Sequence, residues 1–160
     1  MGVSLETTTI AFSIALALTF LAWFASEKTL SIHTIFTKRR ELFYWLTILF
    51  TFALGTAGGD LASEGLGWGY MQSALIFGGL IALVTFSFYF LRVNAIFAFW
   101  AAYILTRPLG ASLGDLMSQP VGDGGMGIGT FGINAVFLTV IVALVAFLTV
   151  TRKDREVLES

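Results

Sequence analysis

The chain has 160 residues, of which 57% are hydrophobic and 12% are charged, and it contains no cysteine and one histidine. An ordinary soluble domain is about 25% charged, so the composition excludes a typical water-soluble protein. The formal net charge of -1 supplies no basic field for nucleic acid. The absence of cysteine excludes a thiolate nucleophile, a disulfide framework and a cysteine-rich metal site. We therefore expect an integral membrane protein that binds no nucleic acid.

Five apolar segments are long enough to cross a bilayer, whose core of about 30 Å needs roughly 20 helical residues. None of them alternates like a membrane-spanning strand, so the predicted fold class is all-α, with five transmembrane helices in a single domain of residues 1–160. The first segment lacks the basic region that precedes the apolar core of a signal peptide, which predicts a retained helix. In chain order the segments cover residues 7–26, 42–61, 65–91, 93–116 and 124–151.

The positions of Lys and Arg predict the orientation, because short loops rich in these residues stay in the cytoplasm. The connections after the second and fourth segments contain neither residue, whereas the other two connections and the tail at 152–160 are basic. This pattern predicts a multi-pass membrane protein with its N-terminus outside and its C-terminal tail in the cytoplasm. The basic residues on the predicted cytoplasmic side are Lys28, Lys38, Arg39, Arg40, Arg92, Arg152, Lys153 and Arg155.

An internal repeat relates the second segment to the fourth at an offset of 55 residues. Eight positions between Trp45 and Ser63 are identical to those between Trp100 and Ser118, in the pattern W-x5-T-x2-LG-x3-GDL-x-S. A glycine-rich turn follows each copy, with five additional residues in the second. Each unit is therefore a pair of helices, residues 42–92 and 94–151, and the two parallel units are related by an axis along the membrane normal. The segment 7–26 precedes them as an additional helix, in the place of a unit's second helix.

These segments carry a resemblance. FYWLTILFTFALGTAGGDL and FWAAYILTRPLGASLGDL, preceded by EKTLSIHTIFTKRREL, resemble an uncharacterised family of bacterial inner-membrane proteins built from four tandem two-helix repeats, each with a tryptophan. The chain matches the C-terminal five helices of that family, which implies an inner-membrane location and implies no activity. Three explanations of the shorter length stay open: a fragment, a split member completed by another membrane chain, or a short form that is a homo-oligomer.

Ionisable residues inside a membrane cost several kcal/mol unless they are paired or hydrated. Arg107 is the deepest, and an ion pair with Asp60 or Asp115 would neutralise it and lock the repeats together. The two acids occupy matching repeat positions, so they would alternatively bind a hard cation or share a proton, or simply end each apolar span. Further oxygen atoms for such a site come from Thr51, Thr106 and Glu64, with Ser63, Ser112 and Ser118 nearby.

Glycines and tryptophans have structural interpretations. Glycines four residues apart predict helix faces that pack closely, and they form two pairs, Gly55 with Gly59 and Gly110 with Gly114. The tryptophans lie near the ends of the predicted spans, which is typical of an aromatic belt at the membrane interfaces. The predicted belt consists of Trp23, Trp45 and Trp100 at the inner interface and Trp68 at the outer one.

Two functions follow from these observations. The repeated acids and the intramembrane arginine predict a transporter of a small solute or cation across the bilayer. The glycine faces and the 24 aromatic residues predict, as the alternative, a structural or accessory subunit of a larger membrane complex. No arrangement of Ser, His and Asp is typical of a catalytic site, so we expect neither an enzyme nor a cofactor, and the identity of any bound metal stays open.

Overall fold

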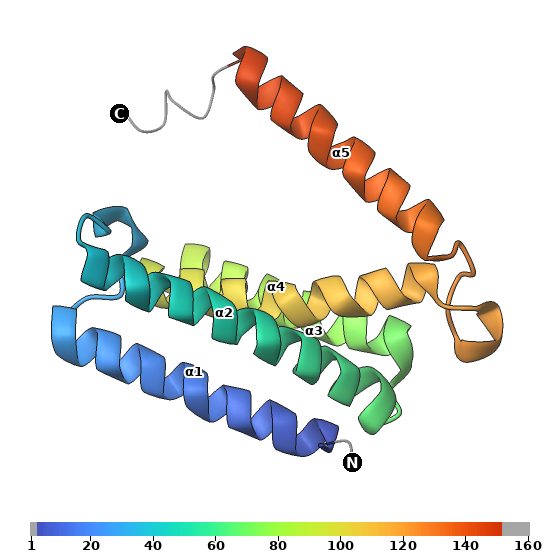
Figure 1. The fold of residues 1–160 in the computed structure, drawn as a ribbon, viewed down its shortest axis with the longest axis horizontal. Helices are drawn as coiled ribbons and strands as arrows, with labels where there is room; N and C mark the ends of the chain where they lie inside the picture. Colours follow the sequence, from blue (N-terminus) through green and yellow to red (C-terminus); the bar gives the residue numbers. More distant parts are fainter. Residues whose placement is uncertain (1–2, 152–160) are drawn as a thin grey trace. The chain divides into compact units, whose positions relative to one another are not determined.

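The computed structural model describes residues 3–151, and these residues form helices and connecting loops without a strand. The five long helices are α1 (Leu5–Glu27), α2 (Lys38–Asp60), α3 (Gly69–Leu91), α4 (Ala95–Ser118) and α5 (Thr130–Thr151) (Figure 1). All five are long and apolar enough to cross a membrane, which confirms the predicted fold class. Three short elements connect them: η1 (Ile32–Thr34), η2 (Leu61–Gly65) and η3 (Val121–Asp123).

Polar residues set the ends of the helices. The Ser4 hydroxyl accepts a hydrogen bond from the Thr7 backbone nitrogen at 3.2 Å and caps α1, and Thr37 caps α2 in the same way through Arg40 at 3.3 Å. These side chains satisfy backbone donors that have no partner within the helix. α1 and α3 end alike, because each is followed by a basic residue in the left-handed conformation, Lys28 with φ 56° and Arg92 with φ 52°.

The glycine-rich turns after α2 and α4 repeat in conformation as well as in sequence. Gly67 and Gly69 have φ values of 69° and 74°, and their counterparts Gly127 and Gly129 have values of 71° and 78°. Such positive φ values favour glycine, which has no Cβ to clash with the backbone. The first copy differs in one respect, because α2 continues into a π-helical turn at η2 that the sequence did not predict.

The chain divides into two compact units, Met1–Leu113 and Gly114–Ser160, each of which is described by itself. In the first unit α1 and α2 are antiparallel neighbours (Figure 1). In the second unit the loop after α4 folds back onto the end of that helix, where the Met126 nitrogen donates to the Leu116 carbonyl at 2.6 Å. A single domain of residues 1–160 stays a prediction, and the tail at 152–160 lies outside the described residues.

Candidate functional site

The contact between α2 and α4 is centred on Gly55. A Cβ atom placed on Gly55 would overlap the Cβ of Arg107 and lie 3.2 Å from its Cα. One turn further, a Cβ on Gly59 would lie 3.1 Å from the Cβ of Ala111 and 3.5 Å from the Cα of Pro108. These neighbouring atoms belong to the backbone or are attached directly to it, so they cannot rotate away. The two glycines therefore allow α4 to place Arg107 against α2.

Aromatic rings surround the Arg107 side chain. Its Nη2 donates a hydrogen bond to the Tyr103 hydroxyl at 2.8 Å, and its guanidinium carbon lies 5.2 Å from the centre of the Tyr103 ring and 5.7 Å from that of Phe52. Cation–π contacts of this kind contribute about 0.5–2 kcal/mol each. The Nε atom, however, is buried and has no hydrogen-bond partner among residues 3–151. The rings therefore hold the charge, and within the described residues the buried Nε is left without a hydrogen bond.

Four fully buried hydroxyl groups share this lack of a hydrogen-bond partner in the described part of the chain. Two lie on α2, one and two turns before Gly55 on the same face, and one lies on α4, one turn after Pro108. The fourth belongs to α3, which runs antiparallel to α4. We call these four residues, together with Arg107, the buried polar row; the hydroxyl residues are Thr47, Thr51, Ser73 and Ser112.

The buried polar row follows the helix axes. From Thr47 on α2, past the contact of Gly55 with Arg107, to Ser112 on α4, its members on these two helices extend over about 20 Å at 1.5 Å per residue, which is most of a bilayer core of about 30 Å. A buried polar group without a partner costs about 1–3 kcal/mol, so these groups need an explanation. Water or a polar solute in the row would supply the hydrogen bonds.

The other residues predicted for the site lie outside this row. Asp60 and Asp115 are half-buried near the C-terminal ends of α2 and α4, and Asp115 belongs to the second unit. Glu64 is exposed and accepts a hydrogen bond from the Tyr70 hydroxyl at 3.3 Å. Thr106 is exposed, and its hydroxyl donates to the Tyr103 carbonyl. An ion pair between Arg107 and either aspartate stays a prediction.

The described residues also form ion pairs away from Arg107. Glu27 lies 3.7 Å from Arg39 and 3.9 Å from Arg40, so these ion pairs connect the end of α1 to the start of α2. Within residues 3–151 no group of three or more His, Asp or Glu side chains is placed to hold a metal ion.

The four tryptophans have different surroundings. Trp23 and Trp100 are buried, with exposed fractions of 0% and 5%, and their rings meet edge to face at 5.8 Å. Phe20 joins them, 5.2 Å from Trp100, and the Trp100 Nε1 donates to the Leu30 carbonyl at 2.9 Å. These two tryptophans therefore fasten α4 to α1 and do not face outward as residues of a belt would. The two exposed tryptophans are Trp45 at 59% and Trp68 at 39%.

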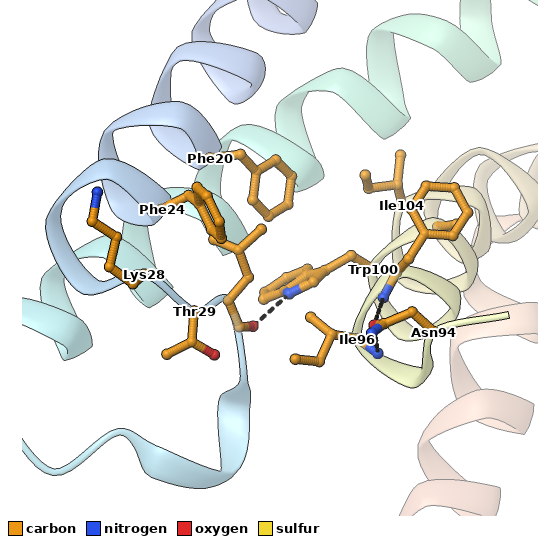
Figure 2. Close-up of a pocket in the computed structure, with 11 residues that line it drawn as sticks. Phe20, Phe24, Lys28, Thr29, Asn94, Ile96, Trp100 and Ile104 are labelled. Atoms are coloured by element: carbon orange, nitrogen blue, oxygen red, sulfur yellow. Dashed lines mark hydrogen bonds between the residues drawn. The ribbon is translucent and has the colours of Figure 1, made fainter.

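A pocket of about 520 Å³ opens beside Trp100, between α1 and α4. Figure 2 shows the rings of Phe20 and Phe24 on one side of it and Ile104 on another, with Lys28 and Asn94 at its margin. The Asn94 side chain is occupied in capping α4, since its Oδ1 accepts hydrogen bonds from two backbone nitrogens. The walls are mostly apolar, so the pocket suits a hydrocarbon chain better than a polar solute. No sequence pattern predicts this pocket, because its residues come from distant segments.

Comparison with known proteins identifies the repeat. The sequence model of a family described as Repeat of Unknown Function (DUF347) matches the chain twice, over residues 43–94 and 98–154. The two matches begin 55 residues apart and the second is five residues longer, which confirms the internal repeat and the insertion predicted from the sequence. No curated protein and no solved structure matches the chain.

Proposed function

Because the chain belongs to the family of this Repeat of Unknown Function (DUF347), whose description states no activity, we propose a function from the chain's own geometry. It transports a small polar solute across the membrane along the buried polar row. The observation that carries this proposal is an arginine within a predicted membrane span that has a buried, unpartnered Nε and unpartnered hydroxyls along the same pair of helices.

The chemistry of the row favours one class of solute. Arginine only donates hydrogen bonds and is always charged, so it repels a cation and attracts an anion or an oxygen-rich neutral molecule. The hydroxyls both donate and accept, so they solvate such a solute before and after Arg107. A small anion is therefore the preferred solute among those that the sequence left open, and a cation site at Asp60 and Asp115 is the less favoured one.

The energetics of burial favour transport over a purely structural role for Arg107. Burying a charge costs desolvation energy, and this cost is best offset when all of the donors are hydrogen-bonded. Among the described residues Arg107 donates a hydrogen bond to Tyr103, and its buried Nε has no partner. A solute that binds in passing would satisfy this donor transiently, which is what transport requires.

Flux into vesicles tests the proposal. The purified chain is reconstituted into phosphatidylethanolamine and phosphatidylglycerol vesicles, and swelling is followed by light scattering in potassium chloride or nitrate with valinomycin present. Glycerol serves as the neutral probe, and potassium uptake without valinomycin tests the cation alternative. We expect anion-driven swelling, reduced to the level of empty vesicles by Arg107→Gln and reduced several-fold by Thr51→Val.

A matched control uses a hydroxyl outside the row. Thr139 of α5 donates to the Ala135 carbonyl within its own helix, so Thr139→Val should leave the flux unchanged. Equal flux for wild type and Arg107→Gln, with both proteins folded, would refute the proposed path. Potassium uptake that is lost in Asp60→Asn and kept in Arg107→Gln would favour the cation alternative.

The second candidate function is a non-enzymatic structural or accessory subunit of a larger membrane complex. The small residues Gly110 and Gly114 on α4, where an added Cβ would meet nothing within 4 Å, favour it, because small residues let a helix of another membrane protein approach closely. A folded protein that passes none of the probes in vesicles would support this candidate over transport.

A further inference from the structure

The two repeats have opposite exposure at equivalent positions. On α2 the glycine face is covered, since Thr51 is fully buried and the contacts at Gly55 come from α4. On α4 the equivalent face is open within its unit: Thr106 and Gly110 are exposed, and a Cβ on Gly110 would have no neighbour within 4 Å. We define the glycine face as Thr51, Gly55 and Gly59 on α2 and as Thr106, Gly110 and Gly114 on α4.

The face that packs against these glycines has the opposite pattern of exposure, since it is covered on α4 and mostly open on α2. On α4 it is used, because it supplies the residues that contact Gly55 and Gly59, while Trp100 on the same side is buried. On α2 it is mostly open: Trp45 is 59% exposed, and Phe52 is 57% exposed although the Arg107 guanidinium lies 5.7 Å from its ring. We define this partner face as Trp100, Arg107, Pro108 and Ala111 on α4 and as Trp45, Phe52, Ala53 and Thr56 on α2. Each repeat therefore has one face in use and one open.

We propose that a second copy of this chain covers both open faces. The partner face of α2 in one copy packs into the glycine face of α4 in the other, and a twofold axis along the membrane normal makes the two contacts identical. The internal contact between α2 and α4 supplies the template, since every residue of the new contact has its counterpart 55 positions away in the existing one. This inference does not rest on the proposed transport.

The directions of the faces set the number of copies. At about 100° per residue, Gly55 and Gly59 point about 90° away from the centre of Phe52, Ala53 and Thr56 around the axis of α2. Two contacts at about a right angle form the corner of a square. Four helices close that square, two from each copy, so a dimer leaves neither face open.

A cavity gives independent support. A niche of about 300 Å³ lies between α3 and α4, with Val84, Phe88 and Ala98 among its lining residues. When the left-handed residues that end α1 and α3, Lys28 and Arg92, are aligned, Val84 and Phe88 correspond to Phe20 and Phe24 of α1. Phe20 is the residue against which Trp100 packs.

The niche therefore occupies, in the second repeat, the position that corresponds to the site beside Phe20 where Trp100 packs. Trp45 is the repeat equivalent of Trp100, and within its own unit it is exposed. In the dimer the indole of Trp45 from one copy enters the niche of the other.

Disulfide cross-linking tests the contact, since the natural chain has no cysteine. The pair Thr56→Cys with Gly114→Cys corresponds to Gly59 and Ala111, whose Cβ positions are 3.1 Å apart, close to the roughly 3.5–4.5 Å of a disulfide. We expect a covalent dimer on a non-reducing gel after mild oxidation of the full chain in vesicles. The pair Gly59→Cys with Ala111→Cys is the matched control, and it should form a disulfide within one chain.

The outcomes separate the alternatives. No dimer from the test pair, while the control pair oxidises, would overturn the proposal. A ladder that continues to trimers would overturn the square arrangement in favour of a larger ring. Protection of Gly114→Cys from a maleimide in a protein that stays monomeric would show that α5 covers the face, and this too would overturn the proposal.

A second measurement does not depend on cysteines. Photobleaching steps of a labelled chain in nanodiscs count its copies, and we expect two for the wild type and one for Gly110→Leu. Gly79→Leu is the control, because Gly79 is an exposed glycine of α3 whose Cβ would also meet nothing within 4 Å. Two copies in both variants would refute the contact at Gly110, and circular dichroism verifies that each variant is folded.

Discussion

Replacement of Gly55 by alanine should weaken the first unit by about 2 kcal/mol, within the range of about 1–3 kcal/mol for overpacking of a well-packed site. The added Cβ would overlap the Cβ of Arg107 and stand 3.2 Å from its Cα. Carbon atoms need about 3.5–4.0 Å, so α2 and α4 have to separate by about 1.5 Å or more at this point. That separation also opens the contact between Gly59 and Ala111, and in lipid no hydrophobic force between helices replaces the lost packing.

The assay is reversible unfolding in mixed micelles with increasing dodecyl sulfate, followed by tryptophan fluorescence. The signal is suitable because Trp23 and Trp100 are buried where α1 meets α4. Gly58→Ala is the control, since a Cβ at Gly58 would meet nothing within 4 Å. Its expected effect is zero or a stabilisation of up to about 1 kcal/mol from the better helix propensity of alanine.

The stabilities of Gly55→Ala and Gly58→Ala together show whether alanine acts through the contact between α2 and α4 or through the helix itself. If Gly55→Ala is as stable as the wild type or more stable, as we expect for Gly58→Ala, α2 and α4 do not meet at Gly55, and the position of Arg107 against α2 is wrong. If both variants are destabilised equally, the effect belongs to the flexibility of the helix and not to the contact.

Three more predictions follow from the geometry. Trp100→Phe removes the indole hydrogen bond to the loop after α1 and should cost about 1 kcal/mol in the same unfolding assay. Tyr103→Phe removes the hydroxyl that accepts from Arg107 but keeps the ring beneath the guanidinium, so it should alter anion flux while changing stability by no more than about 1.5 kcal/mol. Cysteine at Ser31 should react with an impermeant maleimide only from the cytoplasmic side, and cysteine at Val121 only from outside; the reverse labelling would contradict the predicted orientation.

The long helices and the repeat could be predicted from the sequence because both depend on local information. A run of about 20 apolar residues is long enough to span the membrane whatever it packs against, so the predicted segments overlap all five observed helices. The internal repeat also depends on local sequence. The turns at Gly67 and Gly127 share a sequence pattern and also share a left-handed backbone conformation.

The environment of each repeated residue could not be predicted in this way. Thr51 and Thr106 are the same letter in the same motif, yet one is fully buried and the other exposed. The two tryptophans of the repeat, Trp45 and Trp100, differ in the same manner. Which copy of a motif is covered depends on the neighbour that it meets, and a periodicity within the chain contains no information about that neighbour. For this reason the pocket beside Trp100 and the buried polar row could not be predicted from the sequence.

The two repeats differ in charge at one pair of equivalent positions within the apolar helices. Arg107 stands where the first repeat has Phe52, and the guanidinium of one lies 5.7 Å from the ring of the other. Two arginines at these positions would place like charges side by side in a low-dielectric region, where repulsion is strong. Two phenylalanines would leave no charge at all. The difference at this one position therefore places a cation against an aromatic ring, on the two helices that also hold the buried hydroxyls of Thr47, Thr51 and Ser112.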